Sequence, residues 1–163
     1  MSPTASTRRW VPVVLAALAA ILVAVLGLLA TDLDGWYRAL VKPAWQPPDW
    51  LFGPAWTLIF ALAAIAGVRA WRGAPDSAAR NRILSLFAIN AFLNVFWSLL
   101  FFRLHRPDWA LAEVVLLWLS IVALIVGLRP LSRAAAWLLL PYLAWVSFAA
   151  ILNAAIVRLN PVS

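Results

Sequence analysis

The sequence is poor in charge and contains no cysteine, and each absence excludes whole classes of protein. Only 12% of the residues are Asp, Glu, Lys or Arg, whereas soluble domains carry about 25%. Without cysteine there is no disulfide, thiolate metal site or thiol nucleophile. His105 is the single histidine, so we predict no metal site. The rest of the chain is 66% hydrophobic with a mean hydropathy of +0.93, which is typical of a membrane protein.

Five long apolar runs separate the few charged residues. A helix needs about 20 apolar residues to cross a bilayer core of about 30 Å, and no short segment alternates as a membrane β-barrel requires. The first run is too long for the apolar region of a signal peptide, so we expect it to remain as a helix. We predict an all-α membrane protein, a single domain over 1–163 with five transmembrane helices. The expected helices are about 10–31, 50–72, 82–103, 108–128 and 132–158, with a capping loop at 32–49.

The basic residues are divided unevenly between the two sides that five crossings define. Lys and Arg near helix ends favour the cytoplasmic side, so we predict a cytoplasmic N-terminus, with the first loop and the C-terminus opposite. The basic residues are scattered and form no continuous patch, so we expect no binding to nucleic acid. The N-terminal side carries Arg8, Arg9, Arg69, Arg72, Arg80, Arg82, Arg129 and Arg133 with Asp76; the other carries Arg38, Lys42, Arg103, Arg106 and Arg158 with Asp32, Asp34, Asp49, Asp108 and Glu113.

The loop after the first helix is dense in tryptophan and proline, and residues 35–56 read GWYRALVKPAWQPPDWLFGPAW. The prolines prevent a helix between Pro43 and Pro48, so we predict a stiff cap on the helix ends. Two interpretations of the tryptophans compete: anchors at the membrane interface, or the lining of a pocket for a flat apolar ligand. The anchor is favoured for Trp10, Trp71, Trp109 and Trp137, and the pocket for Trp45, Trp50 and Trp56.

Polar side chains occur at helical spacing inside the apolar runs. Asn90, Asn94 and Ser98 share one helix face, where they serve either interhelical hydrogen bonds or ligand contact. Pro141 is expected to kink the fifth helix. Glu113 lies about one turn into the fourth helix, and we interpret it as an acid favoured by the helix dipole. No catalytic constellation is visible, which disfavours a conventional hydrolase or pump.

Short motifs also follow one another in order through most of the chain beyond the first helix. They are Gly35-Trp36-Tyr37, Lys42-Pro43-x-Trp45, Pro47-Pro48-x-Trp50, Gly53-Pro54-x-Trp56, Asn94-x-x-Trp97, Trp109-Ala110-Leu111, Pro141-Tyr142-Leu143-Ala144-Trp145 and Leu152-Asn153. Together they resemble the signature of the TspO/MBR family, which comprises translocator proteins (peripheral-type benzodiazepine receptors) and tryptophan-rich sensory proteins.

The resemblance implies a five-helix bundle in the lipid bilayer, a homodimer in bacterial members, with a ligand pocket beneath the first loop. Members of the family bind porphyrins such as haem and protoporphyrin, together with other lipophilic small molecules. The porphyrin is the ligand, and no further cofactor is implied. Carried over by position, and with Trp50 added from the loop composition, the ligand-binding residues are Trp36, Tyr37, Trp45, Pro47, Trp50, Trp56, Phe60, Asn90, Asn94, Trp97, Trp145 and Ala149.

The leading functional hypothesis is therefore a membrane receptor or sensor for porphyrins, and two alternatives stay open. Trp56 and Trp145 match tryptophans implicated in light- and oxygen-dependent porphyrin breakdown in some bacterial members, so degradation is the first alternative. Transport of tetrapyrroles or lipids is the second. Sterol binding is not expected, because Ala154 stands where the family's sterol segment has tyrosine, although Leu152 and Arg158 are present.

Overall fold

A computed structural model gives the fold of the chain. It describes residues 5–33 and 35–161, and the side chains of residues 10–33 and 35–161. Asp34 and the side chains of Arg8 and Arg9 therefore lie outside the described part. Five helical segments are long and apolar enough to cross a membrane, namely Trp10–Ala30, Asp49–Gly73, Ser77–Arg103, Pro107–Leu128 and Arg133–Leu159. The described residues contain no strand, so the predicted all-α class and the five apolar helices are confirmed.

The five segments are built from shorter elements. The first is α1 (Ala5–Ala30), which is followed by the short α2 (Gly35–Ala39) in the loop. The second consists of η1 (Asp49–Leu51) and α3 (Phe52–Gly73), and the third of α4 (Ser77–Ser98) and the π-helical η2 (Leu99–Arg103). The fourth is α5 (Pro107–Leu128), and the fifth is divided into α6 (Arg133–Leu138) and α7 (Leu140–Leu159).

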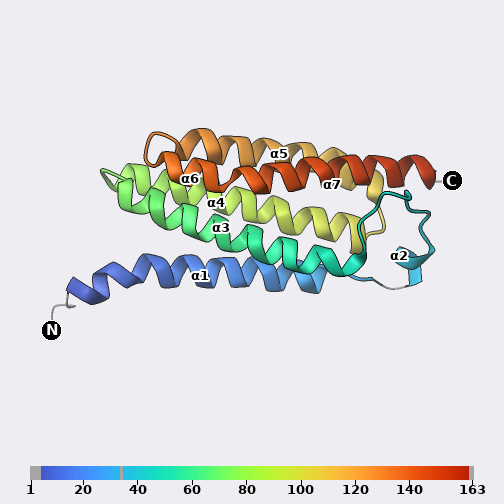
Figure 1. Ribbon diagram of the computed structural model, residues 1–163, viewed down its shortest axis with the longest axis horizontal. Coiled ribbons are helices and arrows are strands. Elements are labelled where there is room, and N and C mark those ends of the chain that lie inside the picture. The colour runs from blue at the N-terminus through green and yellow to red at the C-terminus, as the bar shows by residue number, and fades with distance from the viewer. Residues whose placement is uncertain (1–4, 34, 162–163) are drawn as a thin grey trace.

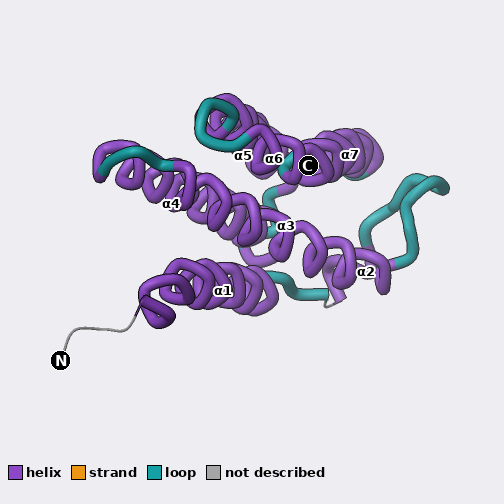
Figure 2. Tube along the Cα trace, turned by 60° about the vertical axis from the view of Figure 1, so that its left-hand side comes forward, coloured by secondary structure: helices purple, strands orange, loops and turns teal. Residues whose placement is uncertain are grey.

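The helices lie roughly parallel to one long axis, with the loop that carries α2 at one end (Figure 1). Helix α1 packs on α3 and α4, α4 packs on α5, and α5 packs on α7. Helix α3 closes the bundle mainly against α6 and touches α7 much less. Seen from a second direction, α1 and α3 lie on one side of the bundle and α5 and α7 on the other (Figure 2). The interval between α3 and α7 is thus bridged by few backbone contacts, and it reaches the end of the bundle that carries the loop (Figure 1).

The helix boundaries differ from the expected ones where capping and proline act. Helix α4 begins at Ser77 rather than near residue 82, because the Asp76 carboxylate caps it by accepting a hydrogen bond from the Ala79 N–H at 2.7 Å. The fifth helix is interrupted at Leu139, because Pro141 has no N–H to donate to the carbonyl of Trp137. This break is the expected consequence of Pro141, and it lets α6 and α7 pack on different neighbours.

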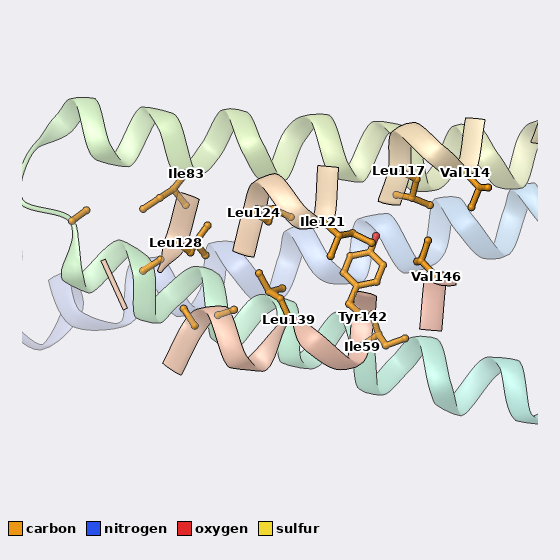
Figure 3. Packing of buried hydrophobic residues seen from close by; sticks show 14 residues of the cluster. Ile59, Ile83, Val114, Leu117, Ile121, Leu124, Leu128, Leu139, Tyr142 and Val146 are labelled. Atoms are coloured by element: carbon orange, nitrogen blue, oxygen red, sulfur yellow. The ribbon is translucent and has the colours of Figure 1, made fainter. Parts of the chain in front are cut away.

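The core lies between α5, α6, α7 and the inner faces of α3 and α4 (Figure 3). Its largest fully buried apolar side chains are Ile121, Leu124, Leu128, Leu139 and Val146. Small residues fill the closest contacts of α3 with its neighbours. Ala66 and Ala70 are both completely buried, which is how small side chains let helix backbones approach inside a membrane.

Gly73, at the end of α3, packs against the turn between α5 and α6. A Cβ atom at this position would lie 2.3 Å from the carbonyl oxygen of Leu131, and a backbone atom cannot yield as a flexible side chain can. We expect Gly73→Ala to reduce the free energy of unfolding by about 1–3 kcal/mol, measured by thermal melting in detergent. The control is Gly53→Ala in the same helix, where a Cβ meets nothing within 4 Å. Equal melting temperatures for the two variants would contradict the prediction.

Candidate functional site

The capping loop is held together by a small hydrogen-bond network. The Tyr37 hydroxyl donates to Asp49 Oδ1 at 3.1 Å, and Gln46 Nε2 donates to the same oxygen at 3.2 Å. The ammonium of Lys42 lies 3.9 Å from the centroid of the Tyr37 ring, a cation–π contact. Burial and the neighbouring Asp49 carboxylate raise the pKa of Tyr37 to about 12. The hydroxyl therefore stays protonated and remains a donor to Asp49 across the physiological pH range.

A second set of contacts ties the loop to the end of α7. The Asn160 side chain accepts a hydrogen bond from the Val41 N–H at 2.9 Å and donates from Nδ2 to the Val41 carbonyl at 2.9 Å. The side-chain amide of Asn160 thus satisfies both the N–H and the carbonyl of Val41, as the backbone of a neighbouring β-strand would. We call this pair of bonds the Asn160 clasp. It fixes the loop over the α3 and α7 ends of the bundle.

Aromatic side chains fill the interval between α3 and α7. Phe52 meets Trp145 edge-on at 5.7 Å, and one turn further in Trp56 meets Tyr142 edge-on at 6.1 Å. Trp56 also stacks on Phe60 at 5.3 Å. Trp45 of the loop reaches Phe148 at 6.0 Å and so joins the cap to these rings. We call the set the α3–α7 aromatic layer, consisting of Trp45, Phe52, Trp56, Phe60, Tyr142, Trp145 and Phe148.

A separate aromatic group packs α2 against the end of α4. Trp36 stacks on His105 with ring centroids 4.3 Å apart and meets Phe101 edge-on at 6.0 Å. Tyr37 contacts Phe102 at 5.6 Å. Trp97 stacks on Phe101 at 5.2 Å. The π-helical turn η2 presents Phe101 and Phe102 to α2, which anchors the start of the loop on the bundle.

A buried polar network lies below the aromatic layer and joins three helices. Asn94 Nδ2 donates to the Tyr142 hydroxyl at 3.1 Å, and that hydroxyl donates to Asn90 Oδ1 at 3.1 Å. Asn90 Nδ2 in turn donates to Ser120 Oγ at 2.8 Å. In Figure 3 the Tyr142 ring points into the bundle interior beside Ile121 and Ile59. Asn90 and Asn94 thus connect α4 to α5 and α7 in this structure.

Nine of the twelve residues that the sequence predicts as ligand-binding lie in three groups, and the other three lie outside them. Trp45, Trp56, Phe60 and Trp145 lie in the aromatic layer, and Asn90 and Asn94 in the polar network. Trp36, Tyr37 and Trp97 pack around η2. Ala149 is half-buried on α7, and Pro47 half-buried in the loop. Trp50, in η1 just before α3, is the most exposed of the twelve, with 71% of its surface exposed.

Glu113 is the residue whose surroundings the sequence interpretation missed. It is only 5% exposed, and neither of its carboxylate oxygens has a hydrogen-bond partner in the described part of the chain. An acid that only complements a helix dipole would remain solvated near the helix end. The available signal was its spacing: Glu113, Leu117 and Ser120 are placed on one face of a helix, and that face is buried.

The sequence of the chain identifies the protein family to which this five-helix structure belongs. The sequence matches the TspO/MBR family over residues 13–159, which is nearly the whole described chain. The chain belongs to the TspO/MBR family. The family resemblance inferred from the loop and helix motifs is therefore confirmed, and this TspO/MBR protein carries all of the motifs on the elements that form the cap, the aromatic layer and the polar network.

Relatives from distant organisms are similar over most of their length. The tryptophan-rich protein TspO of Chlorobaculum tepidum is 43% identical over 134 residues, covering 77% of this chain and 80% of the relative. The protein of the same name from Archaeoglobus fulgidus is 41% identical, covering 80% and 84%. The human translocator protein is 32% identical, covering 77% of this chain and 75% of its own. This TspO/MBR protein is thus similar to bacterial, archaeal and animal members alike.

Proposed function

We propose that this TspO/MBR protein is a membrane receptor that binds porphyrins such as protoporphyrin and haem between α3 and α7, beneath the capping loop. One observation supports the proposal most, namely the aromatic layer that fills this interval under a loop held at α2 and at Val41. Flat rings stack on flat ligands, and each aromatic pair contributes about 0.5–1.5 kcal/mol beyond its buried area. A planar macrocycle is the ligand class that gains most from such a layer.

In the proposed mode the porphyrin replaces contacts that the rings now make with one another. Trp56 and Trp145 each already touch a neighbouring ring edge-on, so a planar ligand would enter by turning these side chains rather than by filling a large preformed cavity. The propionates of the porphyrin would point to the loop, where Arg38 and Lys42 supply positive charge. Iron ligation by histidine is not part of the proposal, because His105 is stacked on Trp36 outside the aromatic layer.

The proposed orientation places the loop opposite the cytoplasm. The arginines near the ends of α3, α4, α5 and α6, listed as Arg69, Arg72, Arg80, Arg82, Arg129 and Arg133, belong to the end of the bundle far from the loop (Figure 1). Positive charge near helix ends favours the cytoplasmic side. A ligand would then reach the aromatic layer from the side opposite the cytoplasm or from the outer leaflet.

The proposed site is tested by replacing its two central tryptophans. We expect the double variant Trp56→Phe, Trp145→Phe to bind protoporphyrin IX about tenfold more weakly, because two large stacking surfaces are reduced. Binding is followed by the shift of the porphyrin's own absorption band, since the substitutions also alter tryptophan emission. Trp137→Phe, whose side chain is 71% exposed on α6, is the control. Unchanged affinity in the double variant would show that the porphyrin site lies elsewhere.

A further inference from the structure

Glu113 is the one Asp, Glu, Lys, Arg or His side chain among those buried in the described membrane segments. The other buried polar side chains there are uncharged, namely Asn90, Asn94, Ser98, Ser120, Asn153 and the phenol of Tyr142. Both oxygens of Glu113 are without a hydrogen-bond partner among the residues that the structure describes. The ion pairs seen among the described residues, Arg103 with Asp32 and Arg106 with Asp108, do not involve it. An acid in a membrane interior without a partner of its own chain is by default a functional residue.

The packing of α4 against α5 fixes what Glu113 faces. These helices run in opposite directions, and the hydrogen bond between Asn90 and Ser120 sets their register. Trp97 lies seven residues after Asn90 on α4, and Glu113 lies seven residues before Ser120 on α5. Both steps lead toward the loop end of the bundle. Seven residues are about two helical turns, or about 10 Å, so both side chains keep the inward direction of Asn90 and Ser120. Glu113 and Trp97 therefore lie at one level of the bundle.

The packing of α5 against α7 completes this level. The Asn153 amide, oriented to suit its neighbours, donates to the Pro107 carbonyl at 3.0 Å and accepts from the Leu111 N–H at 3.1 Å. Ala149 precedes Asn153 by one helical turn on α7, and this register places it near the level of Glu113. Trp145 lies one turn further along the same helix.

Two indole N–H groups near this level also lack hydrogen-bond partners, which is an observation independent of Glu113. The N–H groups of Trp97 and Trp145 are buried and have no hydrogen-bond partner in the described part of the protein. Buried polar groups without partners are uncommon, and each one calls for an explanation. Three unpartnered polar side chains, one acidic and two aromatic, thus occur in adjacent turns of the same interior.

An unpaired carboxylate in an apolar interior is costly, and a cation of opposite charge removes that cost. Aromatic faces add attraction, because the negative face of an indole ring attracts an organic ammonium. We infer that Glu113, flanked by Trp97 and Trp145, forms a binding site for the ammonium group of a lipophilic amine. Glu113 neutralises the charge, the indole rings surround it, and an indole N–H is free to donate to an oxygen elsewhere on the same ligand.

This site adjoins the proposed porphyrin site and deepens it, since an amine would enter the same interior under the same loop. The two proposals differ in what they require. Porphyrin binding depends on the stacking surfaces of Trp56 and Trp145, whereas the ammonium site depends on the charge of Glu113. An experiment that varies ligand charge at constant shape therefore separates them.

The test compares two probes of nearly identical shape, 1-naphthylmethylamine, which is protonated at pH 7, and the neutral 1-naphthalenemethanol. Isothermal titration of the full-length protein in neutral detergent, corrected for protein-free micelles, gives both affinities. We expect the wild-type protein to bind the amine at least tenfold more tightly than the alcohol. Equal affinities in the wild type would overturn the inference without any variant.

Two substitutions then assign the preference to Glu113. We expect Glu113→Gln, which keeps the shape and loses the charge, to bind amine and alcohol equally, and Glu113→Asp to retain a preference for the amine. An amine preference that survives in Glu113→Gln would overturn the assignment. A protein that prefers the amine but does not bind protoporphyrin IX would support this inference and refute the proposed porphyrin function.

Discussion

The Asn160→Ala variant is expected to release bound protoporphyrin about tenfold faster than the unmodified protein. Asn160 makes both hydrogen bonds of the clasp, to the N–H and the carbonyl of Val41. Each such bond contributes about 0.5–1.5 kcal/mol, so removing two weakens the attachment of the loop by about one to three kcal/mol. Because the loop covers the aromatic layer, a looser loop opens more often, and dissociation accelerates while the stacking surfaces remain.

The dissociation rate is measured by displacing protoporphyrin into an excess of empty detergent micelles and following its absorption. Asn160→Asp is an informative intermediate, since its carboxylate still accepts from the Val41 N–H but donates nothing to the carbonyl. Arg158→Ala, which removes an exposed side chain two residues away, is the control and is expected to leave the rate unchanged. A rate for Asn160→Ala equal to that of the control would show that the clasp does not limit release.

The bundle itself was predictable because each helix carries its own signal. Twenty or more apolar residues between charged ends leave a chain in lipid few alternatives to a helix, since every backbone polar group must be satisfied internally. The early start of α4 followed from a feature that hydropathy does not register. Arg80 and Arg82 look like the outside of a membrane span, but a capped helix continues past the membrane boundary, and Asp76 provides the cap.

The helix break at Leu139 was predictable from the sequence, whereas the π-helical turn η2 was not. Proline at position 141 predicts an interruption, and the break at Leu139 follows. The π-helical turn at Leu99–Arg103 contains neither proline nor glycine, so nothing in its composition predicts it. It arises where α4 ends, and there Arg103 donates to the carbonyl of Leu29 at 2.7 Å, a contact between distant parts of the chain. Such tertiary contacts decide local geometry without leaving a local pattern.

In the candidate site, too, some features were predictable from the sequence and others depend on contacts between distant residues. The density of Trp and Pro in the loop indicated a rigid cap, and Trp45 and Trp56 do join the aromatic layer. Composition could not distinguish Trp50, which is 71% exposed, from Trp45, which is 50% exposed and contacts Phe148, or from the half-buried Trp56. The Asn160 clasp joins residues 119 positions apart, so no sequence window contains both partners. For Glu113, position near a helix start suggested an acid favoured by the helix dipole, whereas the structure buries its side chain on the inner face of α5.

Leu124→Ala is expected to lower the stability of the bundle far more than the same truncation at an exposed position of α5. Leu124 is completely buried in the main core. Removing buried methyl groups costs the lost contacts plus the cavity left behind, about 2–5 kcal/mol in soluble proteins. In a bilayer the surrounding lipid is as apolar as the core, so the transfer part is small and the lost packing remains. We therefore expect a decrease of about 2 kcal/mol, measured by titration with a denaturing detergent.

Leu119→Ala provides the matched control, because it makes the same chemical change five residues earlier on the same helix. Half of the Leu119 surface is exposed, so in the membrane lipid or detergent can fill the space that the truncation leaves. Its unfolding free energy is expected to change by about 0.5 kcal/mol or less. If the two variants were equally stable, the buried packing of Leu124 in the main core would contribute no more to the bundle than a leucine that faces lipid.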